Sequence, residues 1–419
     1  MTWSARGVIG GMLLAVATGV EADGARAQEG VPPDTVRTLF DGDTIPGMGA
    51  VGGVVVDALG FVYVADFRNS VWRYTPEGRV EKYADGFYGA SGNAIGPRGE
   101  LYQSSFNGHY VSRIERDGTV RTWVDEGLNG PVGMAAAADG TLFVVNCNGN
   151  TVSRVAPDRT VSTFADGPLF ACPNGITFDD RGDLYVVNFG NTHVVRITPD
   201  GQASSFTQVP GAGGNGHITF ARGDFYVTKF RAHQVFRVSA DGSFSVLAGT
   251  GAQGQTDGPA WTAQMSQPNG IAASPSGTTL YVNDLVSGSG VAGGAARSTL
   301  RMIRLVVLTD VLAAAEPGPE PLEAAYRAYH AARPDENTTT DAIALAYQYF
   351  SGPRGAEGVR LFQLNAETFP DDPNSQYHLG EAYRYIGRAE QAAEQYRKVL
   401  DLAPGHALAA QRLEAVQGG

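Results

Sequence analysis

The sequence predicts an all-β six-bladed propeller in which an N-terminal strand completes the last blade, followed by a small all-α domain. Three observations predict this fold. A β-hairpin pattern recurs six times at a spacing near 40 residues, further strand patterns follow each copy, and helical periodicity takes over from residue 322. A β-rich period of that length is typical of propeller blades, because one four-stranded sheet cannot bury both of its faces without neighbours.

Each copy of the pattern has a buried first strand, a polar turn closed by glycine, and a second strand that begins with an aromatic residue. The clearest copy reads PNGITFDDRGDLYVVN from Pro173. Across the six copies, the leading aromatic residues are Tyr63, Tyr102, Phe143, Tyr185, Tyr226 and Tyr281. Subtraction gives spacings of 39, 41, 42, 41 and 55 residues, which indicates one blade per copy.

The remaining strands close the ring. A third strand follows each hairpin, as in VVRIT from Val194, and a fourth strand follows a further turn, as in VSTFADG from Val161. The sixth blade ends with the strand LRMIRLVVL from Leu300 and has no fourth strand of its own. We therefore expect the segment VRTLFDG, from Val36 to Gly42, to complete it, because closure removes the open edges of the ring.

The first 27 residues have the features of a secretory signal peptide. Arg6 gives a basic start, Val8 to Val20 is a short apolar stretch, and Ala25-Arg26-Ala27 forms a small-x-small cleavage site. An uncleaved anchor is the alternative. The apolar stretch is short for a membrane span, and no second segment of spanning length follows it. The sequence therefore predicts a secreted or periplasmic protein with no membrane span after cleavage.

Charge and cysteine content limit the partners and the compartment. The net charge of −12 argues against nucleic acid and anionic membranes, because both bind basic surfaces. The two cysteines, Cys147 and Cys172, flank the connection between the third and fourth predicted blades. We expect them on one face of adjacent blades, where a disulfide can form in an oxidising compartment. Two unpaired buried thiols are the alternative.

The repeated pattern resembles the six-bladed propellers of the NHL-repeat and regucalcin/gluconolactonase families. The stretch AGTGAQGQTDGPAWTAQMSQPNGIA from Ala248 is similar to the long interblade connection of NHL-type proteins, and the resemblance covers roughly residues 30 to 310. It implies a propeller over residues 28–315, after the signal peptide at residues 1–27. Such propellers include lactonases, esterases, lyases and binding proteins, so the resemblance is more specific for the fold than for the activity.

The C-terminal quarter resembles tetratricopeptide repeats. A linker rich in Pro and Glu at residues 316–321 precedes helical periodicity over residues 322–419. The segment from Asn374 matches the repeat at Leu379, Gly380, Tyr383, Gly387, Ala392, Tyr396 and Pro404. A looser copy lies one period of about 34 residues earlier. The resemblance implies a groove for a peptide or protein partner, and a stabilising appendage or a dimer contact is the alternative.

Two columns of residues are expected around the propeller axis, on the face where first strands begin and second strands end. The first column precedes the glycine of each first strand and consists of Gly52, Ser91, Val132, Asn174, Asn215 and Asn269. The second column lies three residues after each leading aromatic residue and consists of Asp66, Ser105, Asn146, Asn188, Lys229 and Asp284. Ligands dock where polar strand ends converge. We therefore expect this face to bind a small polar molecule, with Asn146, Asn188 and Asp284 among its residues.

The resemblance to the regucalcin/gluconolactonase family implies a divalent metal, commonly calcium, on the first column. The ligands it implies are the amide oxygens of Asn174, Asn215 and Asn269, which suit a hard cation. The glutamate of the family's first blade is replaced here by Gly52, so Asp66 or Asp284 would have to supply a carboxylate. The structural alternative is that asparagine before glycine caps backbone groups where a strand begins.

Two residues near the predicted axis are candidates for chemistry. Lys229 could hold an anionic substrate or an oxyanion, and His217 could act as a base or a metal ligand; a solvated rim lysine and a structural histidine are the alternatives. The GxGxxG matches lie outside any βαβ context, and the sequence contains no HExxH, CxxC or GxSxG motif. Two hypotheses remain: an exported binding protein, and a metal-assisted hydrolase of a lactone or an ester.

Overall fold

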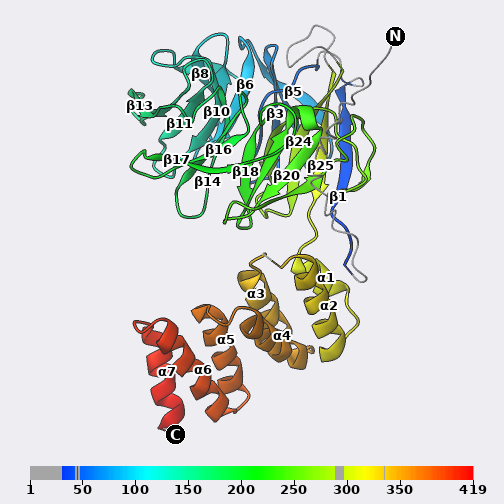
Figure 1. Cartoon of the computed structure of the whole chain (residues 1–419), viewed down its shortest axis with the longest axis vertical. Helices are drawn as coiled ribbons and strands as arrows, with labels where there is room; N and C mark the ends of the chain where they lie inside the picture. The colour runs from blue at the N-terminus through cyan, green and yellow to red at the C-terminus, as the bar shows by residue number, and fades with distance from the viewer. Residues whose placement is uncertain (1–30, 43–44, 46–47, 288–296, 335, 419) are drawn as a thin grey trace, which may run out of the picture.

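The structure is a computed structural model that describes residues 31–42, 45, 48–287, 297–334 and 336–418. The predicted signal peptide at residues 1–27 lies outside these described residues. Figure 1 shows a β-propeller at the top and a helical unit below it. In the described part of the chain the propeller has six sheets arranged around one axis, which confirms the predicted fold class.

Blades one to five are four-stranded antiparallel sheets. Blade one contains β2 (Val54–Val56), β3 (Val62–Asp66), β4 (Ser70–Tyr74) and β5 (Val80–Asp85). Blade two contains β6 (Ala90–Ile95), β7 (Leu101–Ser105), β8 (Tyr110–Ile114) and β9 (Val120–Val124). Blade three contains β10 (Pro131–Ala136), β11 (Leu142–Asn146), β12 (Thr151–Val155) and β13 (Val161–Ala165). Blade four contains β14 (Pro173–Phe178), β15 (Leu184–Asn188), β16 (His193–Ile197) and β17 (Ala203–Gln208). Blade five contains β18 (Ile218–Ala221), β19 (Asp224–Lys229), β20 (Gln234–Val238) and β21 (Phe244–Ala248).

The sixth blade joins the two ends of the propeller. Its strand order is β22-β1-β25-β24-β23. The strands are β1 (Thr35–Asp41), β22 (Gly258–Pro259), β23 (Pro268–Ala273), β24 (Thr279–Ser287) and β25 (Arg297–Arg304). Strand β1 pairs antiparallel with β25, with Val36 opposite Ile303. The predicted closure by an N-terminal strand is therefore confirmed, and the short strand β22 covers part of the outer edge of β1.

Two faces of the propeller follow from the strand directions. We call the face where first strands begin and second strands end the loop face, because the interblade loops reach it. We call the opposite face the hairpin face, because the turn between the first and second strands of each blade lies there, as at residues 57–61 of blade one.

The first strands of the six blades come closest at one glycine each. These glycines are Gly53, Gly92, Gly133, Gly175, Gly216 and Gly270, and we call them the axial glycine ring. A Cβ atom on Gly92 would lie 2.2 Å from the carbonyl oxygen of Val132 in the next blade, and one on Gly270 would lie 2.5 Å from that of Gly52. The Gly53 N–H also donates to the Ser91 carbonyl at 2.7 Å. Backbone therefore meets backbone across neighbouring blades at this level, which no side chain would permit.

The helical unit begins at Leu308, ahead of the linker that the sequence places at residues 316–321. Its helices within the described residues are α1 (Leu308–Ala314), α2 (Pro319–Ala332), α3 (Thr339–Phe350), α4 (Gly355–Thr368), α5 (Pro373–Tyr385), α6 (Ala389–Leu402) and α7 (Ala407–Gln417). Short connections join them, and one apolar core runs through the unit, with Tyr326, Phe362 and Tyr396 almost completely buried. In the described part of the chain, no helix is both long and apolar enough to cross a membrane.

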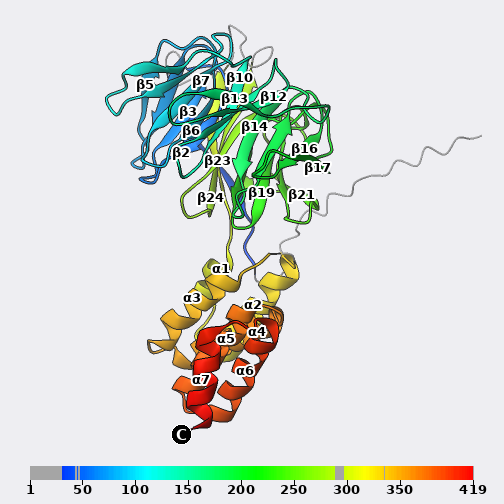
Figure 2. The same cartoon turned by 90° about the vertical axis from the view of Figure 1, so that its left-hand side faces the viewer.

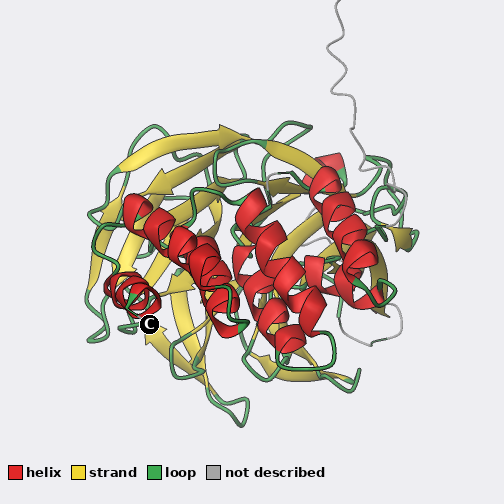
Figure 3. Cartoon of the chain, turned by 90° about the horizontal axis from the view of Figure 1, so that it is seen from below, coloured by secondary structure: helices red, strands yellow, loops and turns green. Residues whose placement is uncertain are grey.

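The helical unit lies on one side of the propeller (Figures 2 and 3). It contacts the hairpin face at blade five. Arg222, on the turn between β18 and β19, pairs with Asp341 of α3. Glu336, between α2 and α3, lies 3.6 Å from Arg222 and 3.8 Å from Arg237 of β20. Arg333 pairs with Asp34, next to β1, at 3.0 Å. A largely buried group of charges therefore joins the two units.

Candidate functional site

Four residues of the second column, Asp66, Asn146, Asn188 and Asp284, anchor the interblade loops, whereas the Ser105 hydroxyl has no hydrogen-bond partner among the described residues. Asp66 accepts hydrogen bonds from the backbone N–H groups of Gly49 and Ala50, at 3.1 and 3.2 Å. Asn146 does the same for Asn129, with 3.0 Å between Oδ1 and N. In each case the donor lies in the loop that leads into the same blade.

The pattern continues in blades four and six. The Oδ1 atom of Asn188 accepts from the Ala171 N–H at 3.2 Å. The carboxylate of Asp284 accepts from the Ser266 N–H at 2.8 and 2.7 Å and lies 3.5 Å from Arg301. Burial raises the pKa of Asp284, and that N–H and Arg301 oppose the rise. The acceptors of these side chains are thus directed to the protein's own backbone.

The first column links neighbouring blades through its amide groups. The Nδ2 atom of Asn174 donates to the Gly216 carbonyl at 2.7 Å, and that of Asn269 donates to the Gly52 carbonyl at 3.1 Å. Their Oδ1 atoms accept no hydrogen bond from any of the described residues. Asn215 differs, because its Nδ2 donates to the His193 carbonyl while its Oδ1 accepts from Lys229. Two amide oxygens therefore remain available on the loop face.

The residues of the loop face do not fit a calcium ion. Among the described residues, no group of three or more His, Cys, Asp or Glu side chains could hold a metal. The third amide oxygen, that of Asn215, lies 3.2 Å from the amine of Lys229. The carboxylate of Asp66 already accepts backbone N–H groups and lies 3.5 Å from Arg68. Calcium needs six to eight oxygen ligands, usually with carboxylates among them, and this donor set offers two uncommitted amide oxygens.

Lys229 ends β19 as a buried cation held by neutral oxygens. Its Nζ atom donates to the Val209 carbonyl at 3.1 Å and to Asn215 Oδ1 at 3.2 Å. No carboxylate of the described chain pairs with it. Burial lowers the pKa of Lys229 to about 8, because desolvation disfavours the charged amine. Part of the population is therefore neutral near physiological pH, so the amine can either bind an anion or accept a proton.

His217 lies on the other side of the axial glycine ring. Its side chain lines an axial cavity of about 310 Å³ that the first strands of all six blades surround on the hairpin side. Burial lowers the pKa of His217 to about 4, so the imidazole is neutral near pH 7. Its backbone N–H donates to the Asn269 carbonyl and to the Thr228 hydroxyl, and among the described residues no hydrogen bond joins its ring to Lys229. The two candidates for chemistry are thus not brought together.

A collar of phenylalanines on the loop face escaped the sequence analysis. The residue directly after the second column is Phe67, Phe106, Cys147, Phe189, Phe230 or Leu285 in blades one to six. Phe67 and Phe106 have ring centroids 5.7 Å apart, and Phe189 and Phe230 have centroids 6.0 Å apart. Phe67, Phe106 and Phe189 are half-buried. Shifting the aligned copies by one position would have revealed this column.

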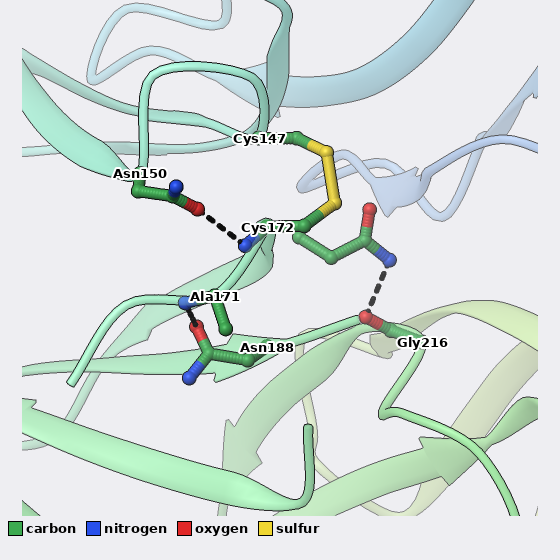
Figure 4. The surroundings of a disulfide bond; sticks show 7 residues. Cys147, Asn150, Ala171, Cys172, Asn188 and Gly216 are labelled. Carbon is green, nitrogen blue, oxygen red and sulfur yellow. Dashed lines mark hydrogen bonds between the residues drawn. A yellow bond between two sulfur atoms is a disulfide. The ribbon is translucent and has the colours of Figure 1, made fainter. Parts of the chain in front are cut away.

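A disulfide replaces the aromatic contact between blades three and four (Figure 4). Cys147, directly after β11, is joined to Cys172, directly before β14. Asn150 Oδ1 accepts from the Cys172 backbone N–H at 2.7 Å, which fixes the same loop. The bridge lies beside Asn174, so it stiffens the loop face next to one of the two available amide oxygens.

Comparisons with known proteins place the propeller in a family. The sequence model of the virginiamycin B lyase family matches residues 63–283, more than half of the chain. No curated protein matches the sequence. A gluconolactonase from Xanthomonas campestris is 19% identical with a TM-score of 0.50, over 66% of this chain and 91% of that one. A protein of unknown function from Bacteroides thetaiotaomicron is 16% identical with a TM-score of 0.52, over 64% and 76%. A catalytically inactive virginiamycin B lyase from Staphylococcus aureus, solved with quinupristin, is 19% identical with a TM-score of 0.46, over 62% and 83%. At these identities the two structures with TM-scores of 0.50 and 0.52 support the fold alone.

Proposed function

The chain belongs to the virginiamycin B lyase family, and on that premise we propose that it is an exported binding protein. Its loop face binds a small, hydroxyl-bearing molecule, and its helical unit binds a protein or peptide partner. A shared propeller fold does not fix an activity, so the proposal rests on the side chains of the two surfaces.

The two available amide oxygens carry the proposal for the loop face. Asn174 and Asn269 use their amide nitrogens to join neighbouring blades, which leaves Oδ1 of each as an acceptor held in a fixed orientation. A hydroxyl group is the matching donor. The half-buried rings of Phe67, Phe106 and Phe189 add apolar surface on the same face. A few oriented polar groups beside aromatic surface are typical of small-molecule sites.

The helical unit supports a partner-binding role through exposed aromatic side chains on α3 and α5. Tyr347 of α3 is 37% exposed, and Tyr385 of α5 is 76% exposed. The Tyr347 hydroxyl lies 2.8 Å from Nδ1 of His378, and the rings of Phe350 and Tyr385 lie 5.1 Å apart. We propose that α3 to α6 form two tetratricopeptide repeats, and that this surface takes a peptide segment. A stabilising appendage on the propeller is the alternative.

The disulfide supports export. Disulfides persist in the periplasm and outside the cell and are rare in a reducing cytosol. The bridge between Cys147 and Cys172 therefore agrees with the predicted signal peptide and with a secreted or periplasmic location.

Lys229 favours a second candidate function, that of an enzyme on a lactone or ester. An amine with a pKa of about 8 can accept a proton near neutral pH. The sequence suggested a calcium-assisted, gluconolactonase-like hydrolase, but the donor set on the loop face does not fit calcium. An enzyme at this face would therefore use Lys229 without help from that ion. Lys229 is completely buried and its amine already donates to two protein oxygens. This favours the binding of a ligand by Asn174 and Asn269 over catalysis by Lys229.

Calorimetric titration with a panel of sugar lactones and the matching polyols tests the proposal. We expect saturable binding that Asn174→Ala and Asn269→Ala each weaken by roughly 5- to 10-fold, the effect of one lost hydrogen bond. Asn107→Ala, an exposed asparagine on the loop face, is the matched control. Equal affinity in the wild type and both variants would overturn the site. Lactone turnover that Lys229→Met abolishes, with binding retained, would favour the enzyme instead.

A further inference from the structure

We propose that the axial cavity on the hairpin side is a second ligand site, for a small uncharged molecule that carries N–H or O–H donors. This site goes beyond the proposed function, because it lies on the opposite side of the axial glycine ring from Asn174 and Asn269.

The cavity is built by the first strands of all six blades. Strands β2, β6, β10, β14, β18 and β23 each contribute residues that follow the axial glycine, such as Val54, Ile176 and Ile271. The close backbone approach at the ring narrows the axis on the loop-face side. The volume of about 310 Å³ is within the range of small-molecule sites. The cavity is therefore large enough for a ligand of roughly ten heavy atoms.

The lining selects against charge. Among the described residues that line the cavity there is no Asp, Glu, Lys or Arg. His217 is neutral at physiological pH, because burial lowers its pKa to about 4. An ion brought into this cavity would lose its hydration without gaining an opposite charge, which is strongly unfavourable. An uncharged ligand is the chemistry that fits.

Two buried polar side chains in the wall have side-chain atoms without hydrogen-bond partners. Asn93 of β6 is 5% exposed, and its Nδ2 donates to the Tyr63 carbonyl at 3.3 Å, whereas its Oδ1 has no hydrogen-bond partner. The ring of His217, which is 7% exposed, forms no hydrogen bond with any described residue. A buried acceptor without a donor is unfavourable. A ligand N–H or O–H group placed against Asn93 removes that deficit.

Blade two is built differently from blade four at this point. Asn93 stands opposite Gln103 of β7, which stands opposite Ser112 of β8. Gln103 Oε1 and Ser112 Oγ are likewise buried without partners. The matching positions of blade four are Ile176, Val186 and Val195. Blade two therefore has a row of unpaired oxygens that leads away from the cavity, where blade four has apolar side chains. The apolar row of blade four shows that the blade fold does not require polar residues at these positions.

A titration with cyclohexanecarboxamide, followed through the ring NMR signals of His217, tests the site. We expect saturable shifts in the wild-type chain, and at least tenfold weaker binding of cyclohexanecarboxylate, which has the same size but carries a charge. His217→Phe, followed by calorimetry, and Asn93→Leu should each weaken the carboxamide by roughly 5- to 10-fold. The exposed variant Asn107→Ala should bind as the wild type does.

The comparison of the two probes needs no variant, so it remains decisive if Asn93→Leu fails to fold. Absence of saturable shifts at His217 would overturn the site, and would mean that water alone fills the cavity. Equal binding of the carboxylate would overturn the selection against charge. Because the probe reports at His217, the result is independent of whether lactones or polyols bind at the loop face.

Discussion

Glu336 is the residue whose replacement most directly tests how the helical unit is attached to the propeller. Its side chain is 8% exposed and lies within 3.8 Å of three arginines, Arg222, Arg237 and Arg333. Both of its carboxylate oxygens accept from the Tyr329 hydroxyl at 2.8 Å. Two of the arginines belong to blade five and the third to the helical unit, so this one carboxylate joins both.

We expect Glu336→Gln to lower the free energy of unfolding of the helical unit by about 3 kcal/mol. Removing one partner from a buried ion pair costs about 3–5 kcal/mol, because the opposite charge remains buried. The lower end of that range applies here, since each arginine keeps another carboxylate: Asp341 for Arg222, Asp224 for Arg237, and Asp34 for Arg333. Glutamine also keeps an oxygen for Tyr329, so the loss is mainly one of charge.

Urea unfolding followed by two probes separates the effects on the two units. Tryptophan fluorescence reports on the propeller, because Trp72, Trp123 and Trp261 all lie there, whereas circular dichroism at 222 nm reports on the helices. In Glu336→Gln we expect the helical transition to move to lower urea while the propeller transition stays in place. The matched control is Glu367→Gln, whose side chain is 50% exposed and pairs with Arg327. An exposed pair contributes about 0–1 kcal/mol. Equal losses in the two variants would refute a structural role for the buried charges.

Three further outcomes are expected. Burial lowers the pKa of Lys229 from 10.5 to about 8. Between these pH values the folded state holds fewer protons than the unfolded state, so the free energy of unfolding rises with pH across that window. Urea titrations at pH 7.5 and 10 should show a gain on the order of 2 kcal/mol that Lys229→Met lacks. Replacing Cys147 and Cys172 with serine should cost about 3 kcal/mol, because the bridge closes a loop with a sequence separation of 25; a reductant should destabilise the wild type by the same amount and leave the double variant unchanged. Val36 of β1 is 2% exposed, so Val36→Ala should cost about 2 kcal/mol in thermal unfolding, and no measurable loss would argue against closure of the ring by β1.

The architecture was predictable because short, local sequence patterns determine it. Strand periodicity, the glycine-closed turns and the leading aromatics such as Tyr185 recur in every blade, and each can be recognised from a short window. Closure by Val36 to Gly42 followed from counting strands, since the sixth blade had one too few. The helix α1 was not foreseen, because its seven residues, Leu308–Ala314, are too few to establish a helical period.

The contacts of the site were harder to predict because they join distant residues. The group around Glu336 brings together residues 34, 222, 237 and 333, and no local pattern indicates which of the chain's charges meet there. The sequence located the second column, but it did not show that these side chains accept hydrogen bonds from the interblade loops. That Asp66 accepts from Gly49 and Ala50 depends on the path of an interblade loop, which the strand pattern leaves open.

In a repeat protein, polar residues that recur in the blades serve the structure, whereas polar residues found in a single blade are better candidates for function. Asn146 and Asn188 recur at one position of the blade because each holds the loop that leads into its own blade, through the same kind of hydrogen bond. A polar residue that recurs is therefore first evidence for a shared structural need. Lys229 occupies the same position in blade five. There its amine donates to the Val209 carbonyl of the loop, whereas Asn188 in blade four accepts a hydrogen bond from a backbone N–H of its loop.

Two departures from the repeat bury a polar side chain less favourably than the other blades do. Lys229 is a buried amine without a carboxylate, and Asn93 is a buried amide whose oxygen has no donor. Both cost free energy: the ammonium of Lys229 is buried without an opposite charge, and the amide oxygen of Asn93 is buried without a donor. A ligand that binds the folded state can offset such a cost. The positions at which one blade differs from the other five are thus the ones at which a ligand should be sought, on the loop face at Lys229 and in the axial cavity at Asn93.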